Sequence, residues 1–212
     1  MQDKFIKTAK RIVIFGCGGH ARSVANVINE LVREEEIIFV DKNARNEELI
    51  YSWRAEQTYN LNGNDVFIVA IGNNDNRRQL YQTLIKQQVG SCISVVSIDA
   101  NIGIDVQIGQ GAFIAQNVYI GPQVKIGNNT IINTGSVVEH ETIIGNHTHI
   151  APHATICGRT KIGDNVFCGA GSTVIDEIRI CDNVVIGAGA VVVKDIIESG
   201  TYVGIPAKKY FK

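Results

Sequence analysis

The sequence predicts a small α/β domain followed by a left-handed parallel β-helix of hexapeptide repeats. Two observations in its 212 residues carry this prediction. Between residues 102 and 197 an aliphatic side chain recurs at every sixth position, and before residue 97 apolar strands alternate with helical segments. A period of six is typical of a β-helix, and strand–helix alternation is typical of a parallel sheet. We therefore expect a Rossmann-like domain over residues 1–98 and a β-helix over residues 99–212.

The first domain is read from apolar runs and the turns between them. The pattern predicts strands RIVIF at 11–15, IIFVD at 37–41, VFIVAIG at 66–72 and a last strand near 93–96. Helices are expected from the glycine turn GCGGHAR to Val32 and from about residue 76 to 88. This order makes a small parallel sheet with crossover helices.

The second domain is read from sixteen consecutive hexads. Their aliphatic positions are Ile102, Ile108, Ile114, Ile120, Ile126, Ile132, Val138, Ile144, Ile150, Ile156, Ile162, Cys168, Val174, Ile180, Ile186 and Val192. We expect these side chains to point inward, with a small or β-branched residue four places later filling the interior. Gly, Asn and Asp are expected at the corners, where φ is unusual. Three hexads close one coil, so residues eighteen apart lie roughly 4.8 Å apart.

The flat sides of such a short stack are expected to be covered by copies of the same chain. Outward apolar residues such as Ile104, Val185 and Val193 indicate a homotrimer. The formal net charge of −1, from 20 basic and 21 acidic residues, gives no footprint for nucleic acid or an anionic membrane. The remaining expected partners are small molecules.

Targeting signals and cysteine chemistry are also constrained. Met1–Lys10 is charged, and no apolar run reaches the roughly eighteen residues of a spanning helix. We expect neither a signal peptide nor a membrane segment, and a cytoplasmic location. The 5 cysteines include no CxxC pair, which argues against a disulfide framework and a zinc cluster.

The first glycine turn predicts a phosphate site. Gly16, Gly18 and Ala21 match G-x-G-x-x-G/A between a strand and a helix, and Asp41 ends the next strand. A dinucleotide-dependent dehydrogenase would need a second mononucleotide half, which the β-helix replaces. A single nucleoside diphosphate therefore fits better, with the alternative that the turn serves only strand-to-helix packing.

Further residues of the same sheet edge would complete this site. Backbone amides after Gly19 would face the phosphates, and His20 and Arg22 would add positive charge or hydrogen bonds. A second turn with Gly72 and Asn73 follows the strand at 66–72 and would line the same edge.

A cluster of histidines is the first sign of chemistry on the β-helix. His140, His147, His149 and His153 fall within fourteen residues, and His140 stands between Glu139 and Glu141. An imidazole beside a carboxylate is a suitable general base for an amine or a hydroxyl. Gly158 lies one coil further on, where its amide and the imidazole could contact one bound thioester. The alternative is a set of solvated surface histidines.

Two other chemistries are conceivable at this cluster, a zinc site and an acyl-carrying cysteine. β-helix carbonic anhydrases bind zinc through histidines, but with a pair separated by four residues and an earlier histidine. Here His149 and His153 are separated by three, so we expect no metal. Cys157 could carry an acyl group, but nothing near it in sequence marks it for activation, and packing is the expected role.

Three segments resemble a known group of proteins. VIFGCGGHAR at the first turn, NTGSVVEHETIIGNHTHIAPHATICG across the histidines and the ending VGIPAKKY are similar to bacterial sugar acetyltransferases. That group joins an N-terminal nucleotide-binding domain to a trimeric left-handed β-helix. It includes nucleotide 4-amino-sugar N-acetyltransferases and sialic acid O-acetyltransferase-like proteins.

The resemblance implies a role for each matching residue. His140 would be the catalytic base, Glu141 its carboxylate partner, and Asn133 and Glu139 would lie near the amine-bearing carbon. The acetyl-CoA site would include His149, Gly158, Pro206, Ala207 and Lys208. The nucleotide would be held by Gly16, His20 and Asp41, and the active site would lie between adjacent subunits.

The implied activity is transfer of acetyl from acetyl-CoA to the 4-amino group of a UDP- or dTDP-linked 4-amino-4,6-dideoxy sugar, for bacterial glycan biosynthesis. Three alternatives stay open. They are a sialic acid O-acetyltransferase, a zinc-dependent hydratase on the same helix and a non-catalytic nucleotide-sugar binding module.

Overall fold

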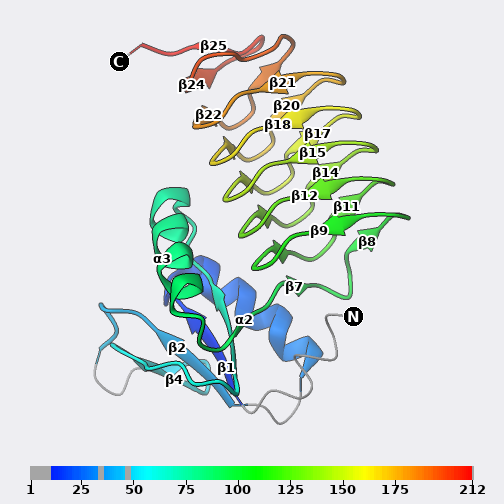
Figure 1. Cartoon of the computed structure of the whole chain (residues 1–212). Coiled ribbons are helices and arrows are strands. Elements are labelled where there is room, and N and C mark those ends of the chain that lie inside the picture. Colours follow the sequence, from blue (N-terminus) through cyan, green and yellow to red (C-terminus); the bar gives the residue numbers. More distant parts are fainter. Residues whose placement is uncertain (1–10, 33–35, 46–48, 212) are drawn as a thin grey trace. The chain divides into compact units, whose positions relative to one another are not determined.

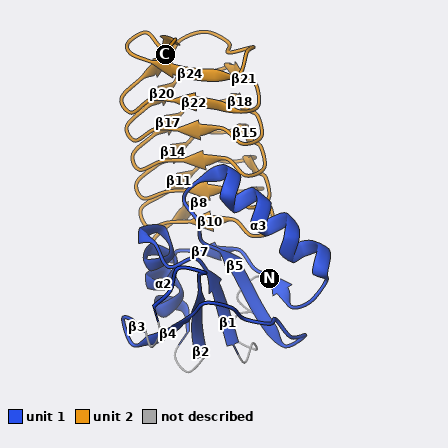
Figure 2. Cartoon of the chain, turned by 90° about the vertical axis from the view of Figure 1, so that its left-hand side faces the viewer, with its two compact units in different colours: residues 1–98 blue, residues 99–212 orange. Residues whose placement is uncertain are grey.

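The structure is a computed structural model that describes residues 11–32, 36–45 and 49–211. The chain divides into two compact units, residues 1–98 and residues 99–212 (Figure 2). The first is an α/β unit and the second a left-handed parallel β-helix, so the expected fold class is confirmed. Met1–Lys10, which we assigned to the first domain, lies outside the described residues.

The first unit is built on one six-stranded sheet with the order β3-β4-β2-β1-β5-β6. The strands are β1 (Arg11–Phe15), β2 (Glu36–Val40), β3 (Leu49–Ile50), β4 (Trp53–Glu56), β5 (Asp65–Val69) and β6 (Ser91–Cys92). All neighbours are parallel except the short pair β3 and β4. The expected strand near residues 93–96 is instead divided into β6 and β7 (Val95–Val96). The β3–β4 pair was not expected from the sequence.

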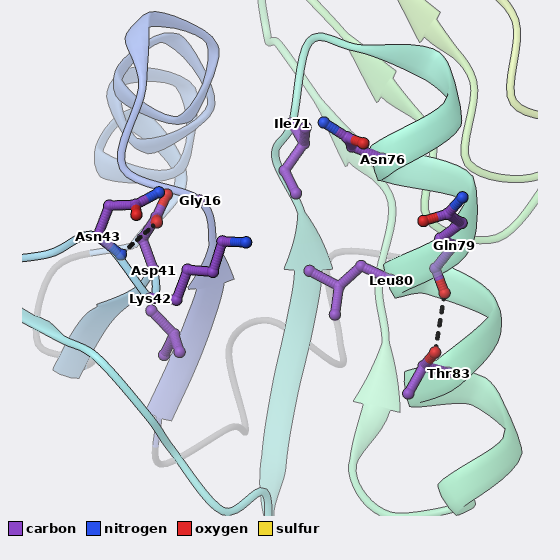
Figure 3. A pocket seen from close by; sticks show the side chains of 10 residues that line it. Gly16, Asp41, Lys42, Asn43, Ile71, Asn76, Gln79, Leu80 and Thr83 are labelled. Atoms are coloured by element: carbon purple, nitrogen blue, oxygen red, sulfur yellow. Dashed lines mark hydrogen bonds between the residues drawn. The ribbon is translucent and has the colours of Figure 1, made fainter.

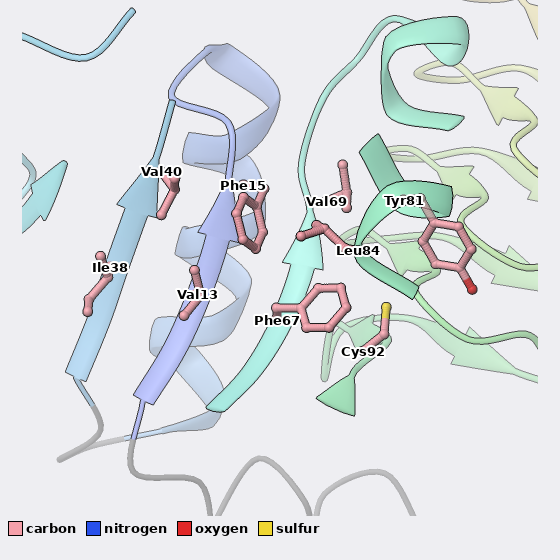
Figure 4. Close-up of a cluster of buried hydrophobic side chains, with 9 residues drawn as sticks. All are labelled: Val13, Phe15, Ile38, Val40, Phe67, Val69, Tyr81, Leu84 and Cys92. Carbon is pink, nitrogen blue, oxygen red and sulfur yellow. The ribbon is translucent and has the colours of Figure 1, made fainter. Parts of the chain in front are cut away.

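Each face of this sheet is covered by one helix. The helix α3 (Asn74–Gln87) places Tyr81 and Leu84 in a core with Val13, Phe67 and their neighbours (Figure 4). The alternate residues of β1 face the other way and are buried on the side of α2 (Gly19–Leu31). Buried positions on α2 recur at i, i+3, i+4 and i+7, the spacing of one helical face.

The β-helix has three faces of short parallel strands (Figure 1). Face 1 contains β10 (Phe113–Ile114), β13 (Ile131–Ile132), β16 (His149–Ile150), β19 (Phe167–Cys168), β22 (Val184–Ile186), β24 (Gly200–Val203) and the antiparallel β25 (Lys208–Lys209). Face 2 contains β8 (Asn101–Ile102), β11 (Tyr119–Ile120), β14 (Val137–Val138), β17 (Thr155–Ile156), β20 (Thr173–Val174) and β23 (Val191–Val192). Face 3 contains β9 (Gln107–Ile108), β12 (Lys125–Ile126), β15 (Ile143–Ile144), β18 (Lys161–Ile162) and β21 (Arg179–Ile180).

Neighbouring coils pair in the expected register. Ile114 pairs with Ile132, Ile132 with Ile150, and Ile150 with Cys168, a shift of one coil each time. These side chains are fully buried, so the aliphatic position of the hexad forms the interior column. Burial also raises the pKa of the Cys168 thiol to about 12, which keeps it protonated and unreactive.

The corners of the coils use a left-handed backbone three places after the aliphatic residue. Asn and Asp occupy several of these corners, as expected, but so do Glu141, His147 and His153, with φ of 59°, 58° and 57°. From Gln123 to Gly189 the backbone N–H of each corner residue donates to a carbonyl of the preceding coil, for example from Glu141 to Pro122 at 2.9 Å. This repeated bond stabilises a conformation that is otherwise unfavourable for side chains of this size.

Several large apolar side chains remain exposed on the β-helix. Ile104, Val185 and Val193, which we expected to face outward, are 74%, 41% and 39% exposed. Among the described residues, no helix is both long and apolar enough to cross a bilayer.

Candidate active site

His140 lies at the corner after β14, on face 2, and is oriented by its neighbour in sequence. Its Nδ1 is 3.1 Å from Oε2 of Glu141, and both side chains are about half exposed. An ionised carboxylate can only accept hydrogen bonds, so this contact places a proton on Nδ1. The lone pair of Nε2 is then available to accept a proton from a bound group.

The His140 ring packs directly against the backbone of Gly158, one coil further on. A Cβ at position 158 would lie 2.6 Å from Cε1 and 2.7 Å from Nε2 of His140, so a side chain there would displace the ring from this position. The available Nε2 is therefore next to the peptide of Gly158. A base and a backbone segment held side by side suit a reaction in which a proton leaves one atom while negative charge develops on another.

Acidic groups surround this corner and affect the neighbouring thiol. Burial, followed by the charges of Asp176 and Glu139, raises the pKa of Cys157. Because its pKa is raised, the Cys157 thiol forms less thiolate and is a poorer nucleophile, which agrees with a packing role. Arg159 donates to Glu177 at 2.9 Å and lies 3.7 Å from Asp176.

His149 and Asn133 form a second group, on face 1. Their side chains meet at 3.2 Å, between Nε2 of His149 and Nδ2 of Asn133. His149 is 7% exposed and its ring stands edge-on to Phe167 with centroids 5.1 Å apart. The structure thus places Asn133 with the expected coenzyme residue His149, whereas His140 and Glu141 lie at the corner after β14, against Gly158 at the corner after β17.

The other two histidines serve different corners. His147 contacts Asn129 at 2.8 Å, between Nδ1 and Nδ2. The His153 ring packs on Gly135, where a Cβ would lie 2.6 Å from its Nδ1. Among the described residues no group of three or more His, Cys, Asp or Glu side chains has a geometry that could hold a metal ion.

The glycines of the first turn have two different roles. Gly16 has φ of 123° and lies so close to Ala70 that a Cβ would be 2.7 Å from its carbonyl oxygen, so packing requires this glycine. At Gly18 and Gly19, by contrast, a Cβ would meet nothing within 4 Å. Gly18 is the N-cap of α2 and no side chain caps the helix there. The packing alternative therefore accounts for Gly16 but leaves Gly18 and Gly19 unexplained, and their small size keeps the helix N-terminus open to a ligand.

Asp41 joins this turn to the end of β2. Its carboxylate accepts the N–H of Cys17 at 3.1 Å and the N–H of Asn43 at 2.9 Å. Part of its function is therefore to hold two loops together. Gly72 of the second turn lies close by, since a Cβ there would be 3.9 Å from Cβ of His20.

A buried arginine forms hydrogen bonds with the backbone of the second turn. Arg77 of α3 donates to the carbonyls of Ile71 and Gly72 at 3.0 and 3.2 Å, and to Oδ1 of Asn74 at 2.9 Å. Burial lowers its pKa to about 9, so the guanidinium keeps its charge at neutral pH. The side chain of Asn73, which we expected to bind substrate, caps α3 by accepting the N–H of Asn76 at 3.0 Å.

A cavity of about 460 Å³ opens at this sheet edge (Figure 3). Of the expected nucleotide residues, Gly16 and Asp41 line it. The other polar lining residues, which the sequence analysis missed, are Lys42 and Asn43 after β2 and Asn76, Gln79 and Thr83 on one side of α3. The three residues of α3 are spaced by three and four, which places them on the helical face opposite the buried Arg77, Tyr81 and Leu84. This spacing was visible in the sequence and could have identified them. An apolar floor between polar walls, large enough for a base and ribose, suits a nucleotide.

The C-terminal residues expected at the coenzyme form a hairpin on the last coil. Ala207 donates its N–H to Val191 at 2.7 Å, and Lys208 lies in β25. The hairpin is tied by Lys209 and Glu198, whose Nζ and Oε2 are 2.9 Å apart. The contact lowers the pKa of Glu198 through the hydrogen bond from Lys209.

One corner of the β-helix carries almost no side chains. The triplet Gly-Ala-Gly occurs at 169–171 and again one coil later at 187–189. At Gly171 and Gly189 a Cβ would meet nothing within 4 Å. These residues, which the sequence analysis also missed, give a smooth strip of exposed backbone; the repeat of the triplet after eighteen residues was the signal.

Comparison with known proteins gives the following matches. Residues 11–84 match the PglD N-terminal domain, and residues 105–140, 123–158 and 159–194 match the bacterial transferase hexapeptide of six repeats. A search of curated protein sequences finds no match.

Solved structures match nearly the whole chain. The acetyltransferase domain of PglB from Neisseria gonorrhoeae FA1090, in complex with acetyl coenzyme A, is 27% identical with a TM-score of 0.88, covering 95% of this chain and 100% of that one. A histidine-to-asparagine variant of perosamine N-acetyltransferase from Caulobacter crescentus, in complex with CoA and GDP-perosamine, is 27% identical with a TM-score of 0.85, covering 95% and 97%. WeeI from Acinetobacter baumannii AYE, at 24% identity, shares the fold with a TM-score of 0.85 and coverage of 94% and 99%.

Proposed function

We infer that this chain, an acetyltransferase that joins a PglD N-terminal domain to the hexapeptide repeats of bacterial transferases, acetylates the 4-amino group of a nucleotide-linked sugar. Acetyl-CoA is the donor. The observation that carries the proposal is the position of the His140 ring, held by Glu141 and packed on Gly158. In a bacterium the reaction would belong to the cytoplasm and would supply glycan biosynthesis.

The proposed role of the first unit is to hold the nucleotide. The cavity beside Gly16 and Asp41 would take the nucleoside, and the uncapped N-terminus of α2 at Gly18 would take the phosphates. His20, Gly19 and the second turn at Gly72 would border the same ligand. Asn73 would contribute only through its backbone, since its side chain caps α3.

The proposed chemistry is direct transfer in a ternary complex. Nε2 of His140 accepts a proton from the sugar amine as the nitrogen attacks the thioester carbonyl. A C–N bond forms, and the negative oxygen of the tetrahedral intermediate is stabilised by the N–H of Gly158. The C–S bond then breaks and the coenzyme thiolate leaves, taking up the proton from His140. Glu141 holds the imidazole and stabilises its protonated form.

The remaining expected residues border the two substrates in this proposal. Glu139 lies beside His140 and would face the amine-bearing carbon, with Asn133. The coenzyme would lie along the Gly-Ala-Gly strip, between His149 and the hairpin of Pro206, Ala207 and Lys208. The pantetheine could follow a corner without side chains closely, through backbone hydrogen bonds.

We also propose a homotrimer with active sites shared between subunits. His140 follows a strand of face 2, while His149 and Lys208 lie in strands of face 1. A neighbouring subunit that packs on the exposed apolar residues would bring a second chain's face against the His140 corner. The trimer would then both bury Val185 and Val193 and complete the site.

The test is turnover with a panel of acceptors. The panel contains UDP-, dTDP- and GDP-linked 4-amino sugars, the last because the Caulobacter protein is in complex with GDP-perosamine. Release of free CoA is followed with each acceptor and with the same amino sugars lacking the nucleotide. We expect kcat/KM to be highest for one nucleotide-linked sugar. Equal turnover of the free amino sugars would contradict a nucleotide site in the first unit.

A further inference from the structure

Arg77 is an unusual residue for the interior of a helix-covered sheet. Its side chain is 1% exposed, although a guanidinium is a charged group that is unfavourable to bury. Its fork reaches back under the second turn, to the carbonyl oxygens of Ile71 and Gly72 and to Oδ1 of Asn74. Helix capping does not explain this arrangement, because the side chain of Asn73 already caps α3.

The two carbonyls on the guanidinium fix two successive peptide planes. In a trans peptide the N–H points opposite to the C=O. With the oxygens of Ile71 and Gly72 turned toward Arg77, the N–H groups of Gly72 and Asn73 point away from it. Ile71 lines the cavity and Gly72 lies beside His20, so this turn is part of the sheet edge that holds the candidate nucleotide site.

We propose that Arg77 is a positioning residue for substrate binding: its buried fork holds the second turn so that the amide of Asn73 faces the nucleotide-linked sugar. The inference rests on the proposed function and deepens it. A backbone N–H held in one direction is a suitable donor to a phosphate or sugar oxygen. The guanidinium on the other side of this peptide adds positive charge without touching the ligand.

The geometry also explains why arginine stands at this position. A guanidinium donates in a rigid planar fork and can hold the carbonyls and Asn74 at once. A lysine would keep the charge but offer a single flexible ammonium. The lysine variant therefore separates the orientation of the turn from the presence of a cation.

The experiment measures direct binding of nucleoside diphosphates by calorimetry. Wild-type protein is titrated with UDP, dTDP and GDP. The nucleotide that binds most tightly is then titrated into the variants Arg77→Lys, Arg77→Met and Asn74→Ala. The control is Arg78→Met, which removes the neighbouring, partly exposed arginine paired with Asp75. We expect Arg77→Lys and Arg77→Met to weaken binding by about tenfold or more, because a reoriented turn loses one backbone hydrogen bond to a charged ligand, and the control to stay within about twofold.

A kinetic readout distinguishes positioning from a general loss of stability. The KM for the nucleotide sugar should rise in Arg77→Lys, while kcat and the KM for acetyl-CoA stay as in wild type. If Arg77 had only a structural role, Arg77→Lys would lower the midpoint temperature of unfolding. The Kd for the nucleotide would then be unchanged at temperatures well below that midpoint. If Arg77→Lys does not fold, Asn74→Ala provides the test, because it removes the side-chain oxygen that accepts a hydrogen bond from the Arg77 guanidinium. Weaker nucleotide binding by Asn74→Ala supports the role of Arg77, and unchanged binding overturns it.

Calorimetry gives one result if the nucleotide site is wrong and another if only the role of Arg77 is wrong. Wild-type protein that binds none of the three nucleotides contradicts the nucleotide site, and the role of Arg77 with it. Wild-type protein that binds a nucleotide, with a folded Arg77→Lys variant that binds it equally well, contradicts the role of Arg77 alone.

Discussion

At the scale of single residues, the contact between His140 and Glu141 makes the imidazole the group to remove first. In His140→Ala, kcat/KM should fall by about 10²- to 10⁴-fold, because no other group would accept the amine proton. Nucleotide binding should be unchanged. The control is His147→Asn, which removes a histidine from another corner and extends a column that already contains Asn129 and Asn165. Activity of His140→Ala within a few-fold of wild type would mean that the base lies elsewhere.

Gly158 offers a test of the same arrangement that leaves the imidazole in place. The added methyl group of Gly158→Ala would overlap the His140 ring, which can move because it ends a flexible side chain. The fold should survive, while kcat falls by about 10²-fold through misplacement of the base. Steady-state kinetics and circular dichroism measure the two effects. The comparison is Gly63→Ala, where a Cβ meets nothing; an equal loss in both variants would contradict the specific contact.

Cys157 separates direct transfer from an acyl-enzyme. Burial and two nearby acids raise the pKa of its thiol, so little thiolate forms at neutral pH. Cys157→Ala should therefore keep kcat within a few-fold of wild type. Mass spectrometry of wild-type protein incubated with acetyl-CoA alone should find no acetylated Cys157. A stable acetyl group there, together with an inactive alanine variant, would replace the direct mechanism by a two-step one.

At the scale of elements, Asp41 connects the end of β2 to the turn before α2. Asp41→Ala removes acceptors for the N–H groups of Cys17 and Asn43. We expect the KM for the nucleotide sugar to rise by about tenfold and the KM for acetyl-CoA to stay constant. Glu36→Ala, at the opposite end of the same strand, is the matched control. A change in both KM values would show that the variant disturbs more than the nucleotide site.

The elements differed in how well the sequence predicted them. The hexads predicted the β-helix strands because each coil repeats one inward position, as Ile132 and Ile150 illustrate. The strands β3 and β4 were missed since they are short and pair mainly with each other and with the edge of β2. Glu141 and His153 occupy corners where Gly, Asn or Asp were expected. A backbone hydrogen bond to the preceding coil stabilises the left-handed conformation at these residues.

The candidate site was predictable where one segment carries it and less so where several segments meet. The Glu139–Glu141 stretch predicted a contact between His140 and Glu141, and the eighteen-residue coil predicted that Gly158 lies beside them; the structure shows both contacts, while the roles of these residues stay predictions. The polar side of α3 was missed, since Gln79 and Thr83 gain meaning only when α3 lies beside the loop after β2. The fork of Arg77 was missed for the same reason, because its contacts lie in the turn before its own helix.

At the scale of the whole molecule, the proposed site between subunits predicts that assembly and activity depend on each other. Sedimentation should find a trimer at micromolar concentration. On dilution, specific activity should fall together with the trimer fraction, because a lone chain would keep its nucleotide cavity but lack the second half of the transfer site. A monomer with full activity would contradict both the trimer and the site between subunits.

The product of the reaction tests most directly whether acetyl is transferred to the amine of a nucleotide-linked sugar. Wild-type protein is given acetyl-CoA with an equimolar mixture of the nucleotide 4-amino sugars and free sialic acid, and the products are analysed by mass spectrometry and nuclear magnetic resonance. We expect one added acetyl group, in amide linkage to the 4-amino nitrogen of a nucleotide sugar. Turnover of free sialic acid to an ester, at a rate equal to or above that of every nucleotide amino sugar, would contradict it.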